Sequence, residues 1–316
     1  MGVEPVSDDV SGVVAAADDE YVAFAGTDVE IGPIGYSTIG LGSATLDDAV
    51  DRIEAAVEAG MTLIDTADVW GFDPNGDDPA HGGGFGAAEA RLGEVLAEVP
   101  GLRDQILLCT KGGRFPPLPL DSSPDYLTQA CDASLYRLGV EVIDLYQVHG
   151  ADLLAHPADV AEALMGLRNA GKVREVGVCG YSIRQIEALQ HYLEAPLVSL
   201  QLPLSALHTD GVTNGSLDHA ICSGITPLAS SPLAGGAVLD GPTGNVLRRI
   251  AGEQGVRPSA VALAWLLHHP AGVVPMVGTT RVNRIRQCAR ADEVGLSRQQ
   301  WYEVWSALHP EWQPGA

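Results

Sequence analysis

Three ionisable residues, Asp65, Lys111 and His149, each end a short apolar run that is typical of a buried strand. The runs are MTLID, QILLCTK and VIDLYQVH. Taken singly, Asp65 could cap a turn, Lys111 could be a solvated strand end, and His149 could be a satisfied core histidine. If the three runs are neighbouring parallel strands, their ends meet at one mouth, where a lysine–aspartate pair beside a histidine favours proton-transfer chemistry.

The elements that must position these residues alternate regularly along the chain. Eight strand-like runs, each followed by a helical segment, predict an α/β fold, specifically a (β/α)₈ TIM barrel in a single domain. A further helix is predicted at 297–308, with Ser297 as N-cap. The predicted strands are STIGLG, MTLIDTA, QILLCTK, VIDLYQVHG, REVGVCG, LVSLQ, TPLASSP and VVPMVGT, and the helices that follow them are 46–59, 87–98, 124–137, 158–170, 183–193, 216–222, 258–268 and 281–291.

Length and composition set the domain boundaries. Residues 1–22 are small and acidic without periodicity and predict a flexible acidic arm, so the barrel is expected to occupy residues 23–316.

Trp265, in the nearly continuous apolar segment PSAVALAWLLH, is expected in the core, and Trp301 and Trp305 lie four residues apart on one helix face. We expect packing roles for all three.

The protein is strongly acidic, with a net charge of −23 from 41 acidic and 18 basic residues. This charge argues against nucleic-acid and anionic-membrane partners, and the absence of a long apolar run or signal pattern predicts a cytoplasmic protein acting on a small molecule. The acidity has two alternative explanations: adaptation to a salt-rich cytoplasm, as in a halophile, or the amino-acid usage of a GC-rich genome. The five scattered cysteines favour neither a disulfide framework nor a zinc cluster, and the oligomeric state is left open.

Several motifs in a fixed order resemble the aldo-keto reductase family, and together they span nearly the whole chain after the arm. They are AGMTLIDTADVWG at 59–71, ILLCTKGG, DLYQVHG, GKVREVGV at 171–178, SPLAGG at 231–236 and VGTTRVNRIR at 277–286. The resemblance implies an oxidoreductase that uses NADP(H), with NAD(H) possible. It also places Asp65, Lys111 and His149 in three positions of the family's catalytic tetrad.

The resemblance further implies a set of cofactor-binding residues. Gln201 takes the position of the glutamine that contacts the nicotinamide carboxamide. Arginine forks suit a 2′-phosphate and favour NADP(H). The pyrophosphate loop is expected at Ser231, Leu233 and Gly235, and the adenosine end at Thr279, Arg281 and Arg284.

The fourth tetrad position, normally tyrosine, holds Trp70. An indole N–H donates a hydrogen bond but neither gives nor takes a proton near neutral pH, so His149, assisted by Lys111, is expected to handle the proton. Tyr181 and His81 are weaker candidates. Beside the nicotinamide position, Cys179 and Gly180 replace the usual Ser-Asn, and Ser230 stands where an aromatic ring is common.

Two long loops follow the second and third predicted strands. In the loop 71–86, Asp73, Asp77, Asp78 and His81 match no known metal-site spacing, and a solvated flexible loop without metal is the favoured interpretation. The loop 112–125 brings Phe115 toward the mouth, either as an apolar substrate wall or as surface packing.

Three functions follow from these observations. The first is an oxidoreductase acting on a carbonyl or alcohol of a small polar, sugar- or polyol-like molecule. The second keeps the cofactor but returns the hydride, as in a redox-neutral epimerase or lyase. The third is a non-catalytic nucleotide-binding barrel.

Overall fold

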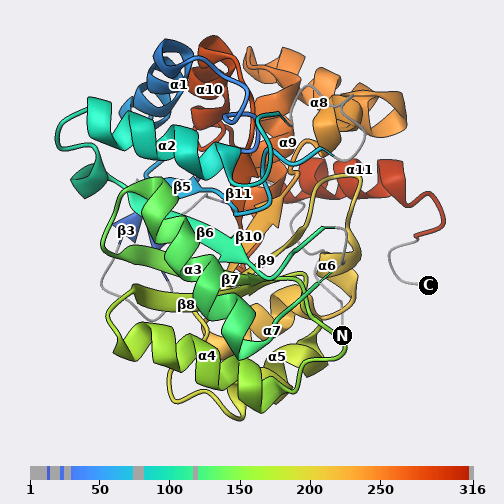
Figure 1. Ribbon diagram of the computed structural model, residues 1–316. Coiled ribbons are helices and arrows are strands. Elements are labelled where there is room, and N and C mark those ends of the chain that lie inside the picture. Colours follow the sequence, from blue (N-terminus) through green and yellow to red (C-terminus); the bar gives the residue numbers. More distant parts are fainter. Residues whose placement is uncertain (1–12, 15–21, 25–29, 74–81, 117–119, 313–316) are drawn as a thin grey trace, which may run out of the picture.

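The protein, described from a computed structural model, is built around a closed barrel of eight parallel strands (Figure 1). The structure describes residues 13–14, 22–24, 30–73, 82–116 and 120–312. Around the barrel the strands follow chain order, which confirms the predicted (β/α)₈ fold. They are β4 (Gly35–Ser37), β5 (Leu63–Asp65), β6 (Leu107–Gly112), β7 (Ile143–His149), β8 (Val173–Cys179), β9 (Ser199–Pro203), β10 (Thr226–Ser230) and β11 (Val274–Val277).

Helices surround the barrel, and several begin at the residues that the sequence marks as caps. Thr45 and Ser123 each accept a hydrogen bond from a backbone N–H of the first turn, and Ser182 and Ser297 form capping boxes. The helices are α1 (Leu46–Glu58), α2 (Ala87–Glu98), α3 (Pro124–Leu138), α4 (Pro157–Asn169), α5 (Ile183–Gln190), α6 (Asp210–Thr213), α7 (Ser216–Ser223), α8 (Gly241–Gln254), α9 (Pro258–Leu267), α10 (Val282–Ala289) and α11 (Arg298–Leu308), with 3₁₀ turns η1 (Arg103–Gln105) and η2 (Ala234–Leu239).

Two differences from the sequence prediction concern a barrel strand and a long helix. The first barrel strand is β4 at Gly35–Ser37, so the predicted strand STIGLG was wrong beyond Ser37, and the residues after it form the loop that leads to α1. The helix α8 was missed because its start, GPTGN, carries two glycines and a proline, which have low intrinsic helix propensity. Burial of Leu247 and Ile250 against the rest of the molecule compensates for that weakness.

Short N-terminal strands flank the barrel. The strands β2 (Val22–Ala23) and β3 (Glu30–Ile31) pair antiparallel, and Phe24 and Ile31 are buried in one cluster with barrel residues that include Leu63 and Leu145. A further strand, β1 (Val13–Val14), pairs with β12 (Leu296–Ser297). The rest of the predicted acidic arm, residues 1–12 and 15–21, lies outside the described residues.

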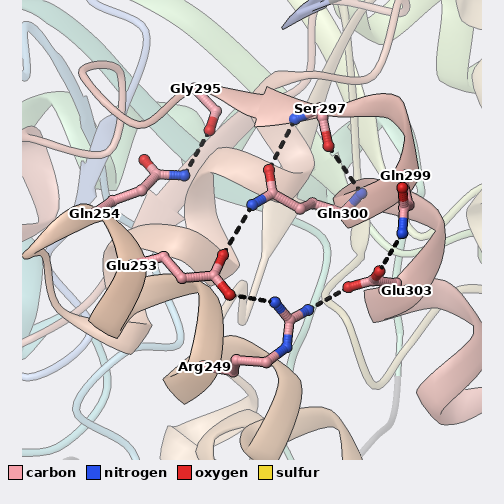
Figure 2. A network of polar contacts seen from close by, with 8 residues as sticks. All are labelled: Arg249, Glu253, Gln254, Gly295, Ser297, Gln299, Gln300 and Glu303. Carbon is pink, nitrogen blue, oxygen red and sulfur yellow. Dashed lines mark hydrogen bonds and ion pairs between the residues drawn. The ribbon is translucent and has the colours of Figure 1, made fainter. Parts of the chain in front are cut away.

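The last helix is fixed to α8 by a polar network (Figure 2). Arg249 on α8 bridges Glu253 on its own helix and Glu303 on α11. Gln300 on α11 donates to Glu253, and its amide oxygen accepts from the Ser297 backbone. Exposed ion pairs add little stability singly, so this network chiefly sets how α11 lies against α8.

Tryptophans hold α9 against α11. Trp265 is 1% exposed, as predicted, and its ring stacks on Trp301 with centroids 4.8 Å apart. The two indole N–H groups donate reciprocally, each to the other residue's backbone carbonyl. Trp305 stacks on the far side of Trp301, which confirms packing roles for these rings. No helix in the described part of the chain is long and apolar enough to span a membrane.

Candidate active site

The carboxyl ends of adjacent strands bring the expected site residues together. In the barrel register, Asp65 on β5 pairs with Cys109 on β6, and Lys111 on β6 pairs with Gln147 on β7. Nearer the carboxyl ends of the strands, the register pairs His149 on β7 with Cys179 on β8, and Cys179 in turn with Gln201 on β9. Because side chains alternate along a strand, residues two apart on these strands face the same interior, and all of them share one mouth.

Lys111 and Asp65 form a buried ion pair at the centre of this mouth. The Nζ of Lys111 lies 2.5 Å from Oδ1 of Asp65 and donates a second hydrogen bond to the carbonyl oxygen of Thr66 at 2.8 Å. Their side chains are 1% and 0% exposed. Burial is the largest single influence and acts to lower the pKa of Lys111, but Asp65, Cys109 and Cys179 together outweigh it and leave that pKa raised, so the lysine is a fixed ammonium.

Trp70 lies over this ammonium. The Nζ of Lys111 is 4.3 Å from the centroid of the Trp70 ring, which is the geometry of a cation–π contact. Two backbone hydrogen bonds hold Trp70 in its loop. Its N–H donates to the carbonyl oxygen of Ala67, and its own carbonyl oxygen accepts from the N–H of Ala88. With two hydrogen bonds and an aromatic face, the ammonium is engaged on three sides.

His149 ends β7 and is 8% exposed. Its Nδ1 is buried and has no hydrogen-bond partner in the described chain. Burial, followed by the positive charges of Lys111 and Arg114, lowers the pKa of His149 well below its ordinary value of 6.5. The ring is therefore neutral at neutral pH and available as a base.

Gln201 on β9 is hydrogen-bonded to the ion pair. Its Nε2 donates to Oδ2 of Asp65 at 3.0 Å, so both oxygens of that carboxylate are engaged. The amide oxygen of Gln201 is buried and has no partner within the described residues. A buried acceptor without a donor is costly, and it fits a ligand that brings an N–H group, as a nicotinamide carboxamide does.

Cys179, Gly180 and Ser230 lie at the ends of β8 and β10, the two strands that flank the strand of Gln201. Cys179 and Ser230 are partly exposed at the ends of β8 and β10, and burial raises the pKa of the Cys179 thiol. Gly180 has φ +68 and an added Cβ would meet no atom within 4 Å, so open space adjoins it. No bulky side chain stands at these three positions, which leaves room beside Gln201 for a planar ring.

The loop after β10 has the backbone shape of an anion cradle. Ser231 and Ala234 have positive φ angles of 51° and 48°, and Gly235 and Gly236 follow at 65° and 101°. In two turns, the Ala234 N–H donates to the carbonyl oxygen of Ser231 and the Gly236 N–H donates to the carbonyl oxygen of Leu233. Successive residues in left-handed turns direct backbone N–H groups to one side, which suits a pyrophosphate.

A second phosphate site is indicated where α10 begins. Arg281 is the N-cap residue of this helix and Arg284 lies in its first turn; both are exposed and neither guanidinium has an ion pair in the described chain. Thr279 is fixed just before them, since its carbonyl accepts from the Tyr36 hydroxyl at 3.1 Å. A helix N-terminus with two free arginines is electrostatically suited to a phosphate group.

The family model described as Aldo/keto reductase family matches residues 33–308. The chain belongs to this family. Membership confirms the resemblance of the ordered motifs and makes the protein an aldo-keto reductase-type oxidoreductase.

Sequence and structure searches identify similar proteins. One is the 6-dehydroglucose reductase of Novosphingobium aromaticivorans, 45% identical over 273 residues, which covers 84% of this chain and 88% of that protein. The crystal structure of a thermostable aldo-keto reductase with the inhibitor epalrestat has a TM-score of 0.80 at 25% identity, covering 91% and 99% of the two chains. An aldo/keto reductase from Klebsiella pneumoniae, crystallised with NADP and acetate, has a TM-score of 0.76 at 23% identity, covering 94% and 97%.

Sequence reasoning missed two ionisable residues of this aldo-keto reductase site. Asp68, three residues after Asp65, is fully buried behind the mouth, and its N–H donates to the Lys111 carbonyl at 3.0 Å. Burial raises the pKa of Asp68 well above its ordinary value and the nearby Glu89 carboxylate adds to the rise, only partly offset by Arg137. The second residue is Arg114. Asp68 lies within the motif AGMTLIDTADVWG and Arg114 directly follows ILLCTKGG, so the residue order alone could have pointed to both.

The two long loops are described in part. Phe115 is exposed and packs against Phe85 and Tyr126, with ring centroids 6.3 and 5.4 Å apart, so the loops after β5 and β6 meet through aromatic rings. Tyr181 is partly exposed, and burial raises the pKa of its phenol, which makes it a weak acid. Asp77, Asp78 and His81 lie outside the described residues.

Proposed function

We propose that this protein is an NADP(H)-dependent oxidoreductase that interconverts a carbonyl and an alcohol on a small, sugar-like molecule. The observation that carries the proposal is the buried Lys111–Asp65 pair, which shares one mouth with a neutral His149 and the unpartnered amide oxygen of Gln201. The sugar-like substrate is supported by the relative from Novosphingobium, which is named for the reduction of 6-dehydroglucose.

The cofactor-binding residues support NADP(H). Gln201 would accept a hydrogen bond from the carboxamide, and the loop from Ser231 through Leu233 to Gly235 would hold the pyrophosphate. Thr279, Arg281 and Arg284 would hold the adenosine end with its 2′-phosphate, and the related Klebsiella structure is a complex with NADP. When bound, the nicotinamide supplies or accepts the hydride.

His149 is the residue proposed to handle the proton. In alcohol oxidation, its neutral ring would take the hydroxyl proton as the carbon loses hydride. In carbonyl reduction the proton would come from the imidazolium, which is the minor form of His149 at neutral pH. Lys111 would act electrostatically, because its three N–H groups already face Asp65, Thr66 and the Trp70 ring. Its fixed charge stabilises the negative charge that develops on the substrate oxygen.

Trp70 would wall the pocket and contribute at most a hydrogen bond from its indole N–H. In this proposal the indole keeps the ammonium desolvated, which strengthens the electrostatic effect of Lys111 at the substrate oxygen. The catalytic set is thus Asp65, Lys111 and His149, with Trp70 as the aromatic wall beside them.

A cofactor titration followed by a substrate screen tests the proposal. We expect NADPH to bind more tightly than NADH and to be oxidised in the presence of 6-dehydroglucose or related sugar aldehydes. Formation of product while bound cofactor stays unconsumed would instead identify a redox-neutral epimerase or lyase. Binding of neither nucleotide would overturn the proposal.

A further inference from the structure

Arg114 stands at the mouth of the barrel, and its guanidinium has no partner among the described residues. It follows Lys111 by three residues, on the loop that leaves β6. Gly113, immediately before it, has φ +115, and a Cβ added there would lie 3.5 Å from the backbone nitrogen of His149. The loop is closed by a hydrogen bond from Asp121 N–H to the Gly113 carbonyl at 2.9 Å, so the base of Arg114 is held beside His149.

The guanidinium of Arg114 is exposed and makes neither a hydrogen bond nor an ion pair within the described chain. Arginines elsewhere in this acidic protein are mostly paired, as Arg137 is with Glu89 and Arg103 with Asp144. The unpaired ones include Arg281 and Arg284, at the expected cofactor phosphate. The unpaired guanidinium of Arg114 is therefore free to bind an anion at the mouth of the barrel.

The charge of Arg114 reaches the reacting end of the site. Together with Lys111 it lowers the pKa of His149, and it also acts on the thiol of Cys179, the register neighbour of His149. Its carbonyl oxygen accepts from the Tyr126 hydroxyl at 3.3 Å, and Phe115 beside it packs on the Tyr126 ring. The guanidinium thus sits on a braced loop next to an aromatic surface.

We propose that Arg114 binds a carboxylate on the substrate, so that the preferred substrate is an anionic sugar derivative of the sugar-acid class. The inference rests on the proposed carbonyl–alcohol activity. A guanidinium matches a carboxylate with two parallel hydrogen bonds, and the apolar face of a sugar ring suits the neighbouring aromatic rings. The carboxylate would be held at the rim, while the reacting carbon lies deeper, next to His149.

Matched substrate pairs test this role in the NADPH-loaded enzyme. The pairs are D-glucuronate with D-glucose, and 4-carboxybenzaldehyde with benzaldehyde. We expect wild-type protein to prefer the carboxylated member of each pair. Arg114→Gln should lower the ratio of kcat/KM between the carboxylated and the neutral member about 10- to 100-fold, and Arg114→Lys should be intermediate.

Arg257→Gln is the matched control, because Arg257 is also unpaired but lies at the turn before α9, beside Gln287 and Arg290. It should leave the preference unchanged. Equal loss for charged and neutral substrates in Arg114→Gln, or a loss of NADPH affinity in that variant, would overturn the inference.

A binding measurement separates this inference from the proposed function. D-Gluconate has no aldehyde or ketone to reduce, so calorimetry on the NADPH-loaded protein reports carboxylate binding without turnover. We expect binding that weakens at high salt and is lost in Arg114→Gln but not in Arg257→Gln. Binding that does not depend on Arg114 overturns the inference, whereas a failed carbonyl screen counts only against the proposed activity.

Discussion

The ammonium of Lys111 lies 4.3 Å from the centre of the Trp70 ring, so an aromatic face occupies the place where this family usually presents a phenol to the lysine. A phenol beside an ammonium is an acid, whereas an indole is only a hydrogen-bond donor. The same contact keeps the Lys111–Asp65 pair out of water. In the proposed mechanism, Trp70 therefore alters how protons move in the site while the central charge pair is preserved.

Trp70→Tyr should raise carbonyl reduction, because a tyrosine would restore a proton donor next to Lys111. We expect kcat for an aldehyde to increase about 100-fold, within the usual range for one acid catalyst. Trp70→Phe is the control, since it keeps an aromatic wall without an acid and should show no increase. Equal activity of all three proteins would show that Trp70 does not determine the chemistry.

Lys111→Met should destabilise the protein as well as inactivate it. The substitution leaves the Asp65 carboxylate buried without its ammonium, and such a change costs about 3–5 kcal/mol. Urea unfolding measures the difference. The double variant Lys111→Met/Asp65→Asn removes both charges and should recover part of the loss. If the double variant is no more stable than the single one, the buried pair is not the cause.

Because of His149, kcat/KM for alcohol oxidation should fall on the acid side of the pH–rate profile, at a pH below 6.5. Its pKa is lowered in the folded protein, so the neutral, proton-accepting form persists at neutral pH and is lost only as the pH falls through the lowered pKa. Arg114→Gln removes one of the positive charges that lower the pKa of His149, so this fall in kcat/KM should move to higher pH. A pH–rate profile of kcat/KM measures both effects, and an unchanged fall in His149→Ala would contradict the assignment.

Asp68→Asn should stabilise the folded protein at neutral pH. The pKa of Asp68 is raised, so its contribution to stability is lost as the pH rises through that higher value. An amide of the same size carries no charge, and we expect a gain of about 1–3 kcal/mol in the free energy of unfolding. Asp51→Asn, on the exposed face of α1, is the control and should change stability little. A loss of stability in Asp68→Asn would show that the folded protein needs the carboxylate.

Arg281→Gln/Arg284→Gln should weaken NADPH binding while leaving NADH binding nearly unchanged. Each guanidinium is expected to make charge-assisted contacts with the 2′-phosphate, which only NADPH carries. Fluorescence titration should give a dissociation constant for NADPH that is about 10- to 100-fold higher. Equal weakening for both nucleotides would place these arginines on the pyrophosphate instead.

Part of the site was predictable because it depends on local chain geometry. Asp65, Lys111 and His149 each end an apolar run, and consecutive parallel strands bring their carboxyl ends to one mouth. Other features depend on contacts between residues far apart in the chain. The hydrogen bond from Gln201 to Asp65 spans 136 positions, and the burial of Asp68 follows from the packing of the loop after β5 against α2 and α3.

The sequence by itself determined the barrel, the order of its strands and the identity of the three ionisable residues, because periodicity and strand ends are local properties. Only the tertiary structure decided that Trp70 covers Lys111, that His149 is neutral and that Arg114 has no partner. Charge state and pairing depend on burial and on neighbours brought close by folding, and neither can be read from spacing along the chain.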